Sequence, residues 1–230
     1  MLTGPSGEFV DVRLPKDTSS SDNVTSHPSF WAFSGKTETT FHDADGQSFA
    51  VDMPYAAHCK FIHDIDSRGP GIADEGDMFL LQNGDCMEMG IMGNPATGKD
   101  ELYKEYWCGA DKIAVTDFDS ETSSCVVAKV VSPKDGRGVV IKLGGRIQGV
   151  IARRQKENQS VVEVERWLCK NRDATQQSSA ADSRDAQSTW SRDVRSNARL
   201  PKDWLCAKDR SIGDKFEYNG LTWRISEVHA

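Results

Sequence analysis

Residues 101–107 carry side chains that could support acid–base chemistry. If this segment is a β-strand, alternate side chains point to the same side, so Glu101, Tyr103, Glu105 and Trp107 share one face. Carboxylates beside a tyrosine and a tryptophan could bind a ligand and move a proton, because an apolar wall raises the pKa of a carboxyl group. For any one carboxylate, such a pattern is about twice as often a solvated strand face. We take Glu105 and Tyr103 as catalytic candidates and Trp107 as a ligand-binding candidate.

Residues 86–92 form a second candidate strand. Glu88 shares a face with Gly90, whereas Met87 and Met89 share the opposite face. Glu88 is therefore a further catalytic candidate. Methionine side chains are pliable, so Met87 and Met89 belong either to the core or to the wall of a ligand pocket. Glu88 points away from that wall unless a bulge at Gly90 re-aims the strand.

An arginine on an apolar strand face is another candidate. Arg166 stands between Val164 and Leu168 in the alternation of its predicted strand. Such an arginine either pairs with a carboxylate or binds an anionic or carbonyl oxygen of a ligand. We take Arg166 as a catalytic candidate, and an internal ion pair with Glu88 or Glu105 is the open alternative. The remaining ligand-binding candidates are Trp31, Arg146 and Gln148.

The usual signatures of metal and cofactor chemistry are missing from the sequence. His58 and His63 are five residues apart on a predicted strand, hence on opposite faces, and the six cysteines form no C-x-x-C pair. The string NPATGKD lacks the spacing of a phosphate-binding loop, because Lys99 is followed by Asp100. No dinucleotide fingerprint or G-x-S-x-G elbow occurs. We expect no metal and no cofactor.

Charge and length narrow the class of partner. The 230 residues carry a formal net charge of -7. An acidic chain repels phosphate groups, so we expect neither nucleic acid nor an anionic membrane as a partner. No apolar run reaches the roughly 20 residues of a membrane span, and the first residues lack the regions of a signal peptide. We expect a cytoplasmic protein with reduced cysteines.

Short runs of alternating apolar and polar residues recur along the chain, separated by Gly, Asp, Asn and Pro clusters. DADGQ, QNGD and the Asn-Gly near residue 220 predict tight turns. We expect an all-β fold of two antiparallel β-barrel-like halves with little helix, residues 1–118 and 119–230. Residues 171–197 are predicted to be a polar loop with one short helix near 180–187. The predicted strands are residues 9–14, 30–41, 48–53, 57–65, 77–81, 86–92, 101–107, 125–131, 139–143, 146–153, 160–169, 216–218 and 221–228.

Several ordered strings resemble the fungal Hri protein family. They are WAFSGKTE, DEGDM, GNPATGK followed by LYKEYW, VVIKLGGRIQGVI and VEVERW, and the match covers residues 7–167 and more loosely extends to 228. The resemblance implies two antiparallel barrel-like halves, similar to lipocalins and other calycins, and brings no defined reaction. The family is named for a yeast protein that interacts with a casein-kinase-type protein kinase, so the resemblance also implies a kinase partner.

The chain departs from the family pattern at several places. FLL follows DEGDM where the family usually has Pro-containing polar residues, EMG stands where it tends to read ERG, and WCG where it tends to read WRD. The lost charges and the gained Met, Leu and Cys mark a divergent member with a more apolar lining or surface. By analogy with divergent fungal paralogues, this favours a role in secondary metabolism.

Two functions follow as hypotheses. The first is a small-molecule-binding β-barrel, in its stronger form a cofactor-independent isomerase, cyclase or dehydratase that acts on an apolar fungal secondary metabolite. The second is a non-catalytic adaptor for a protein kinase, which an acidic surface suits where the partner face is basic. Members of the family that the chain resembles carry an additional leading strand before the equivalent of Leu2, and this sequence starts later. The strand edges left exposed could pair between two copies and form a homodimer.

Overall fold

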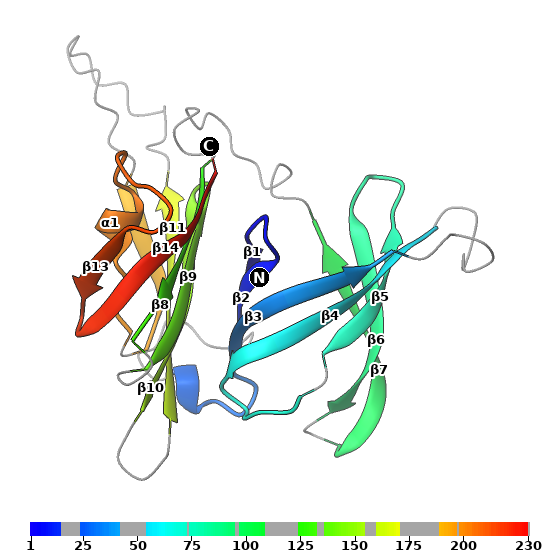
Figure 1. The fold of residues 1–230 in the computed structure, drawn as a ribbon. Coiled ribbons are helices and arrows are strands. Elements are labelled where there is room, and N and C mark those ends of the chain that lie inside the picture. Colours follow the sequence, from blue (N-terminus) through cyan, green and yellow to red (C-terminus); the bar gives the residue numbers. More distant parts are fainter. Residues whose placement is uncertain are drawn as a thin grey trace, which may run out of the picture. The chain divides into compact units, whose positions relative to one another are not determined.

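Figure 1 shows the fold of the computed structural model, which describes residues 1–14, 24–41, 54–72, 74–94, 97–108, 124–132, 136–154, 160–170, 189–196 and 198–229. Within these ranges the chain forms fourteen strands in two seven-stranded sheets, with helical turns only at η1 (Val24–Ser26) and α1 (Lys202–Leu205). The expected all-β class with two antiparallel halves and little helix is confirmed. The end strands of each sheet are not paired with one another, so in the described part both halves are open sheets.

The first sheet is a meander in which each strand pairs with the next one in the chain. The predicted Asn-Gly hairpin is confirmed, because Gly84 has a φ of 82° and its N–H donates to the carbonyl of Leu81. The strands, in sheet order, are β1 (Leu2–Thr3), β2 (Glu8–Arg13), β3 (Trp31–Thr40), β4 (Tyr55–Asp66), β5 (Glu75–Leu80), β6 (Cys86–Asn94) and β7 (Lys99–Trp107).

The second sheet has the order β12-β11-β10-β9-β8-β14-β13. Its last hairpin turns at Asn219 and Gly220, with φ values of 52° and 72°. Two successive positive φ angles are the geometry of the tight turn that an Asn-Gly pair favours. The strands are β8 (Cys125–Val130), β9 (Arg137–Leu143), β10 (Arg146–Arg154), β11 (Ser160–Lys170), β12 (Thr189–Arg195), β13 (Lys215–Tyr218) and β14 (Leu221–His229).

The chain divides into two compact units, each assembled from separate segments. Unit 1 comprises Met1–Ser34, Ile65–Arg68 and Phe118–Ala230, and unit 2 comprises Gly35–Asp64 and Gly69–Asp117. The last boundary lies beside the one expected after residue 118, whereas the first 34 residues group with the later part of the chain. The strands β3 and β4 therefore contribute residues to both units.

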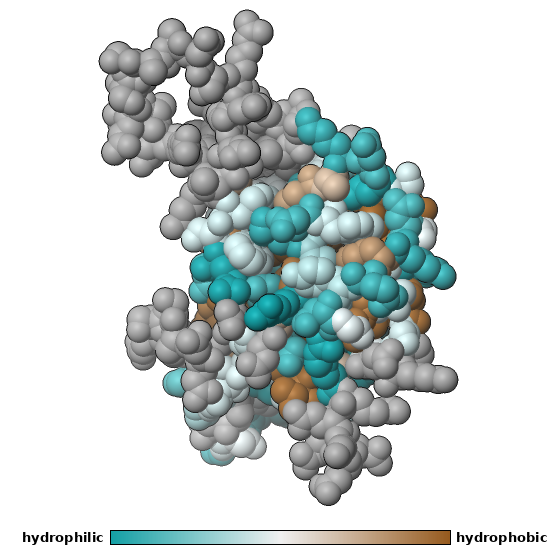
Figure 2. Space-filling model, turned by 90° about the vertical axis from the view of Figure 1, so that its left-hand side faces the viewer, coloured by the Kyte–Doolittle hydropathy of each residue, from teal (hydrophilic) through white to brown (hydrophobic). Residues whose placement is uncertain are grey.

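Unit 1 buries both faces of its seven-stranded sheet. One face packs against β2 and the start of β3, where Val10 and Ala32 join a cluster with Val127. The other face packs around α1, where Leu205 meets Trp223 in a second cluster. Since alternate side chains of a strand point to opposite faces, central strands such as β8 are apolar at nearly every position. The surface of unit 1 seen in Figure 2 is mostly hydrophilic, with separate hydrophobic areas.

Three differences from the sequence prediction concern short or polar elements. β12 lies within the segment predicted to be a polar loop, and it forms because it pairs with β11 around a register shift at Arg166/Trp167. Neither β1 nor α1 was predicted. The predicted strand 48–53 and the predicted helix 180–187 lie outside the described residues. Among the helical segments that are described, none has the length and hydrophobicity needed to cross a bilayer.

Candidate functional site

Glu88 lies at the centre of one face of the unit 2 sheet. It pairs with Met78 of β5 and with Glu105 of β7, and it is only 1% exposed. Its Oε1 accepts a hydrogen bond from the Tyr103 hydroxyl at 2.6 Å, and its Oε2 accepts one from the indole N–H of Trp107 at 2.8 Å. Tyr103 and Trp107 stand on either side of Glu105 at the spacing that puts strand residues on one face. The structure thus joins three candidate residues of the sequence.

Two glycines leave space for the Tyr103 side chain. A Cβ on Gly90, the cross-strand partner of Tyr103, would lie 2.5 Å from the Tyr103 hydroxyl and 2.6 Å from the carbonyl oxygen of Glu75. A Cβ on Gly76 would lie 2.8 Å from Glu88 Oε1 and 2.9 Å from the same hydroxyl. The pairs that β6 makes with β5 and β7 show no register shift. Gly90 is therefore a point of close approach and not a bulge.

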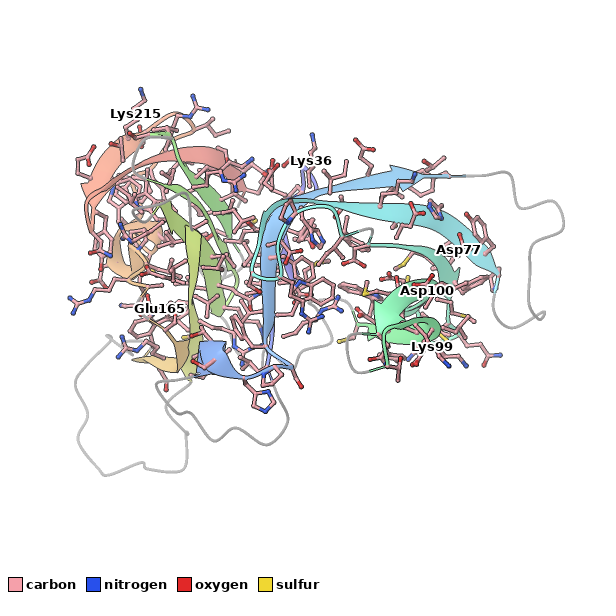
Figure 3. All side chains as sticks on the ribbon, turned by 90° about the horizontal axis from the view of Figure 1, so that it is seen from below. Lys36, Asp77, Lys99, Asp100, Glu165 and Lys215 are labelled. Atoms are coloured by element: carbon pink, nitrogen blue, oxygen red, sulfur yellow. The ribbon has the colours of Figure 1, made fainter. Side chains whose placement is uncertain are left out.

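The face that carries Glu88 is concave and aromatic. Phe61 of β4 stacks on Trp107 of β7, with ring centroids 6.0 Å apart and an interplanar angle of 11°. In a flat sheet, strands three places apart are separated by about 14 Å. The ring contact therefore requires the sheet of unit 2 to curve towards this face, and the curling of its strands can be followed in Figure 3.

The environment of Tyr103 fixes the direction of its hydrogen bond to Glu88. Burial raises the pKa of Tyr103 well above its usual value of 10.0, and the hydrogen bond to Glu88, the charge of Glu88 and the charges of Asp74 and Glu105 raise it further. Tyr103 therefore keeps its proton and donates, while the carboxylate of Glu88 accepts. The hydroxyl also lies 3.1 Å from the carbonyl oxygen of Glu75.

A buried His–Asp pair lies in the same unit. His63 Nε2 is 3.4 Å from Asp74 Oδ2, and the two side chains are 6% and 2% exposed. Sequence reasoning missed this pair, because His63 was weighed only as a metal ligand and was not connected with Asp74. The available signal was the alternation of β4, which puts His63 on the same face as Phe61. No group of three His, Cys, Asp or Glu side chains suited to a metal occurs among the described residues.

The other candidates on β6 and β7 divide between the two faces. Glu105 is half-buried and lies directly opposite Glu88. Met87 and Met89 are half-buried on the opposite face, where Tyr106 is the β7 partner of Met87. They do not share the concave face with Glu88, as the alternation of the strand predicted.

Arg166 lies in unit 1 and has a carboxylate partner. Its Nη2 is 2.7 Å from Asp193 Oδ2, and its Nε lies 2.9 Å from the same oxygen. The internal ion pair weighed for Arg166 exists, but its partner comes from β12 and not from Glu88 or Glu105. Asp193 was overlooked because it lies in the segment predicted to be a polar loop.

The ligand-binding candidates Gln148, Trp31 and Arg146 lie next to other residues of unit 1. Gln148 is buried, and its Nε2 donates to the carbonyl of Val10 at 2.8 Å. Trp31 is buried, and its indole N–H donates to Asp66 Oδ1 at 2.9 Å. The guanidinium groups of Arg13 and Arg68 lie 4.8 and 4.5 Å from the Trp31 ring. Arg146 starts β10 opposite Leu143 and Leu168.

Unit 2 therefore brings several ionisable and hydrogen-bonding side chains together. It combines a buried carboxylate that accepts hydrogen bonds, a phenol that keeps its proton and a buried His–Asp pair, next to two stacked aromatic rings. Such groups can take a proton from a ligand or give one to it without a cofactor.

Comparison with known proteins gives a family and a fold. A family model described as "Protein HRI1" matches residues 1–227. Among solved structures, the crystal structure of the uncharacterized protein YLR301w from Saccharomyces cerevisiae is similar, with a TM-score of 0.64 and 18% sequence identity. The similarity covers 98% of this chain and 89% of the yeast chain. No curated protein matches this sequence.

Proposed function

The chain belongs to the HRI1 family, and from that premise we propose that unit 2 binds a small molecule on the concave face around Glu88. The observation that carries the proposal is the burial of the Glu88 carboxylate between a phenol and an indole. Removing an ionised carboxylate from water costs several kcal/mol. A sheet that needed only stability would be better served by an apolar side chain at this position.

The surroundings of Glu88 indicate the ligand class. Trp107 is half-buried, and its ring, which stacks on the buried ring of Phe61, offers flat apolar contact area. A hydroxyl or amine of the ligand would donate to the Glu88 carboxylate in place of the indole N–H of Trp107. The proposed ligand is therefore an apolar, ring-containing metabolite with at least one hydrogen-bond donor.

The stronger form of the proposal is a cofactor-independent isomerase, cyclase or dehydratase of fungal secondary metabolism. Glu88 would accept a proton from the ligand, Tyr103 would hold the carboxylate in place, and His63 with Asp74 would serve as the second proton carrier. The burial of these groups and their placement in one unit support this assignment of roles.

Native mass spectrometry tests the proposal. The protein purified from a fungal host should carry a discrete added mass that chains produced in bacteria lack. Glu88→Gln, which keeps the shape and removes the charge, should lose the added mass. Glu101→Gln is the matched control, because Glu101 is an exposed glutamate of the neighbouring strand β7 in the same unit. An unmodified mass for the wild-type protein, or equal retention by both variants, would contradict the proposal.

The alternative function is a protein-kinase adaptor. The observation that favours it is the exposed apolar character of the other face of β6 and β7, where Ile91 and Leu102 are cross-strand partners exposed by 66% and 64%. A pull-down from fungal extract with Leu102→Glu as the matched variant tests it. The adaptor role predicts a kinase that the wild type recovers and the variant does not; equal recovery by both contradicts it.

A further inference from the structure

β7 is an edge strand with an exposed outer face. Within the described residues its only hydrogen-bonded neighbour is β6, and Lys99, Asp100, Leu102 and Lys104 are all exposed. Figure 3 labels Lys99 and Asp100 at the start of this strand. An exposed strand edge with apolar side chains is a ready template for another strand.

The sequence of β7 is complementary to itself in one antiparallel register. If two copies of β7 pair about a two-fold axis at Leu102, Asp100 of each copy faces Lys104 of the other. One pair further out, Lys99 of each copy faces Glu105 of the other. These four pairs join opposite charges, which stabilises cross-strand neighbours, and the pairs next to the axis set Glu101 opposite Tyr103.

Neighbouring registers lack this complementarity. An axis at Tyr103 sets Glu101 opposite Glu105, which are two negative charges. An axis at Glu101, Lys104 or Glu105 sets a charged residue opposite its own copy. Like charges directly opposite each other destabilise a sheet, so the axis at Leu102 is favoured on charge.

We propose that two copies of this chain form a dimer in which their β7 strands pair antiparallel about Leu102. The two Leu102 side chains then meet at the axis, and the Ile91 beside each extends the apolar contact on the same face. A two-fold axis makes the contact self-complementary and closed. The proposal stands independently of ligand binding by unit 2.

The dimer also changes the surroundings of Glu88. In the single chain Glu88 and Glu105 are directly opposed carboxyl groups. The pairing places the partner's Lys99 opposite Glu105, on the face that Tyr103 and Trp107 share. The second copy thus supplies a positive charge beside the acidic side of the candidate site.

Charge exchange tests the register. Light scattering after size-exclusion chromatography should give a dimer mass for the wild type. Asp100→Lys or Lys104→Asp alone should raise the dimer Kd by roughly tenfold or more, because two attractive pairs become repulsive. The double variant Asp100→Lys/Lys104→Asp should restore the dimer. Lys36→Glu is the control, because Lys36 is an exposed residue of β3 in the same unit.

A cysteine at the axis gives a second test. Residues directly opposite each other have Cα atoms about 4.5–5.5 Å apart, within the range that a disulfide spans. Leu102→Cys should therefore form a covalent dimer on oxidation, whereas Asp100→Cys should remain at the wild-type background. A monomeric wild type, failure of the double variant to restore the dimer, or equal cross-linking of the two cysteine variants would overturn the proposal.

Discussion

The Tyr103 hydroxyl lies 2.6 Å from Oε1 of Glu88, and it reaches this position because the residue opposite Tyr103 on β6 is a glycine. The hydrogen bond and the glycine depend on each other. Gly90 leaves space for the Tyr103 ring, and the Tyr103 hydroxyl donates to the buried carboxylate of Glu88. Each part can be altered separately.

Tyr103→Phe should lower the free energy of unfolding by about 1–3 kcal/mol, because it leaves Glu88 with one donor fewer in a buried site. Urea denaturation measures the change. Tyr218→Phe, at an exposed tyrosine, should change stability by less than about 0.5 kcal/mol. Equal effects of the two substitutions would show that the bond to Glu88 contributes nothing.

Gly90→Ala should destabilise the protein by about 1–3 kcal/mol, because its Cβ would collide with Tyr103 and with the backbone of β5. Gly93→Ala on the same strand is the matched control, since the nearest atom to its Cβ is 3.7 Å away. Thermal unfolding of both variants checks the prediction, and a Gly90→Ala variant as stable as Gly93→Ala would contradict the close approach of Tyr103.

Neighbouring residues of β11 should respond very differently to truncation. Glu165 is buried, and its Oε2 accepts the backbone N–H of Leu200 at 2.6 Å, so Glu165→Ala should cost about 1–3 kcal/mol. Arg166 forms a partly exposed pair with Asp193, so Arg166→Ala should cost at most about 1 kcal/mol. Urea denaturation measures the loss in the free energy of unfolding for each variant. A larger loss for Arg166→Ala than for Glu165→Ala would contradict the prediction.

Alkaline pH should destabilise unit 1 through Cys125. Burial raises the pKa of this thiol from its usual 9.0 to about 11, and Glu227 adds to the shift. Between these two pKa values the folded state holds a proton that the unfolded state releases. The thiol's contribution to the free energy of unfolding is therefore fully present below pH 9 and is lost as the pH rises through 11. Burial lowers the pKa of Lys142. The titration of Lys142 therefore makes the free energy of unfolding rise with pH, opposite to the effect of Cys125.

Comparison of two variants isolates the contribution of Cys125. Between pH 8 and pH 10.5 the wild type and Cys108→Ala should lose stability in parallel, because Cys108 is exposed. Cys125→Ala should lose less over the same interval, by about 1–3 kcal/mol. Denaturant midpoints at the two pH values give the difference, and parallel loss by all three proteins would contradict it.

Most strands could be predicted because alternation and Asn-Gly turns are local signals. The faces of β6 and β7 followed from the same alternation, which placed Tyr103 with Trp107 and set Glu88 apart from Met87. Sheet curvature is not a local property, so the stacking of Phe61 on Trp107 could not be predicted.

The missed elements depend on contacts that are distant in sequence. β12 has a polar sequence that reads as a loop, and it becomes a strand through pairing with β11. Because β12 was not predicted, Asp193 on this strand could not be predicted as the partner of Arg166. His63 and Asp74 meet only when the segment that ends in Asp74 returns to β4, where the Phe61 N–H donates to the carbonyl of Asp74.

The interleaving of the two units sets an order for folding during translation. The segments of unit 2 end at residue 117, whereas β1 and β2 of unit 1 pack against β9 and β10. During translation, all strands of unit 2 are synthesised before β9. Until the later strands of unit 1 are made, the apolar side chain of Val10 lacks the residues it packs against in the folded protein. A released chain that ends at residue 125 should therefore hold a protease-resistant unit 2 and an N-terminus still open to cleavage.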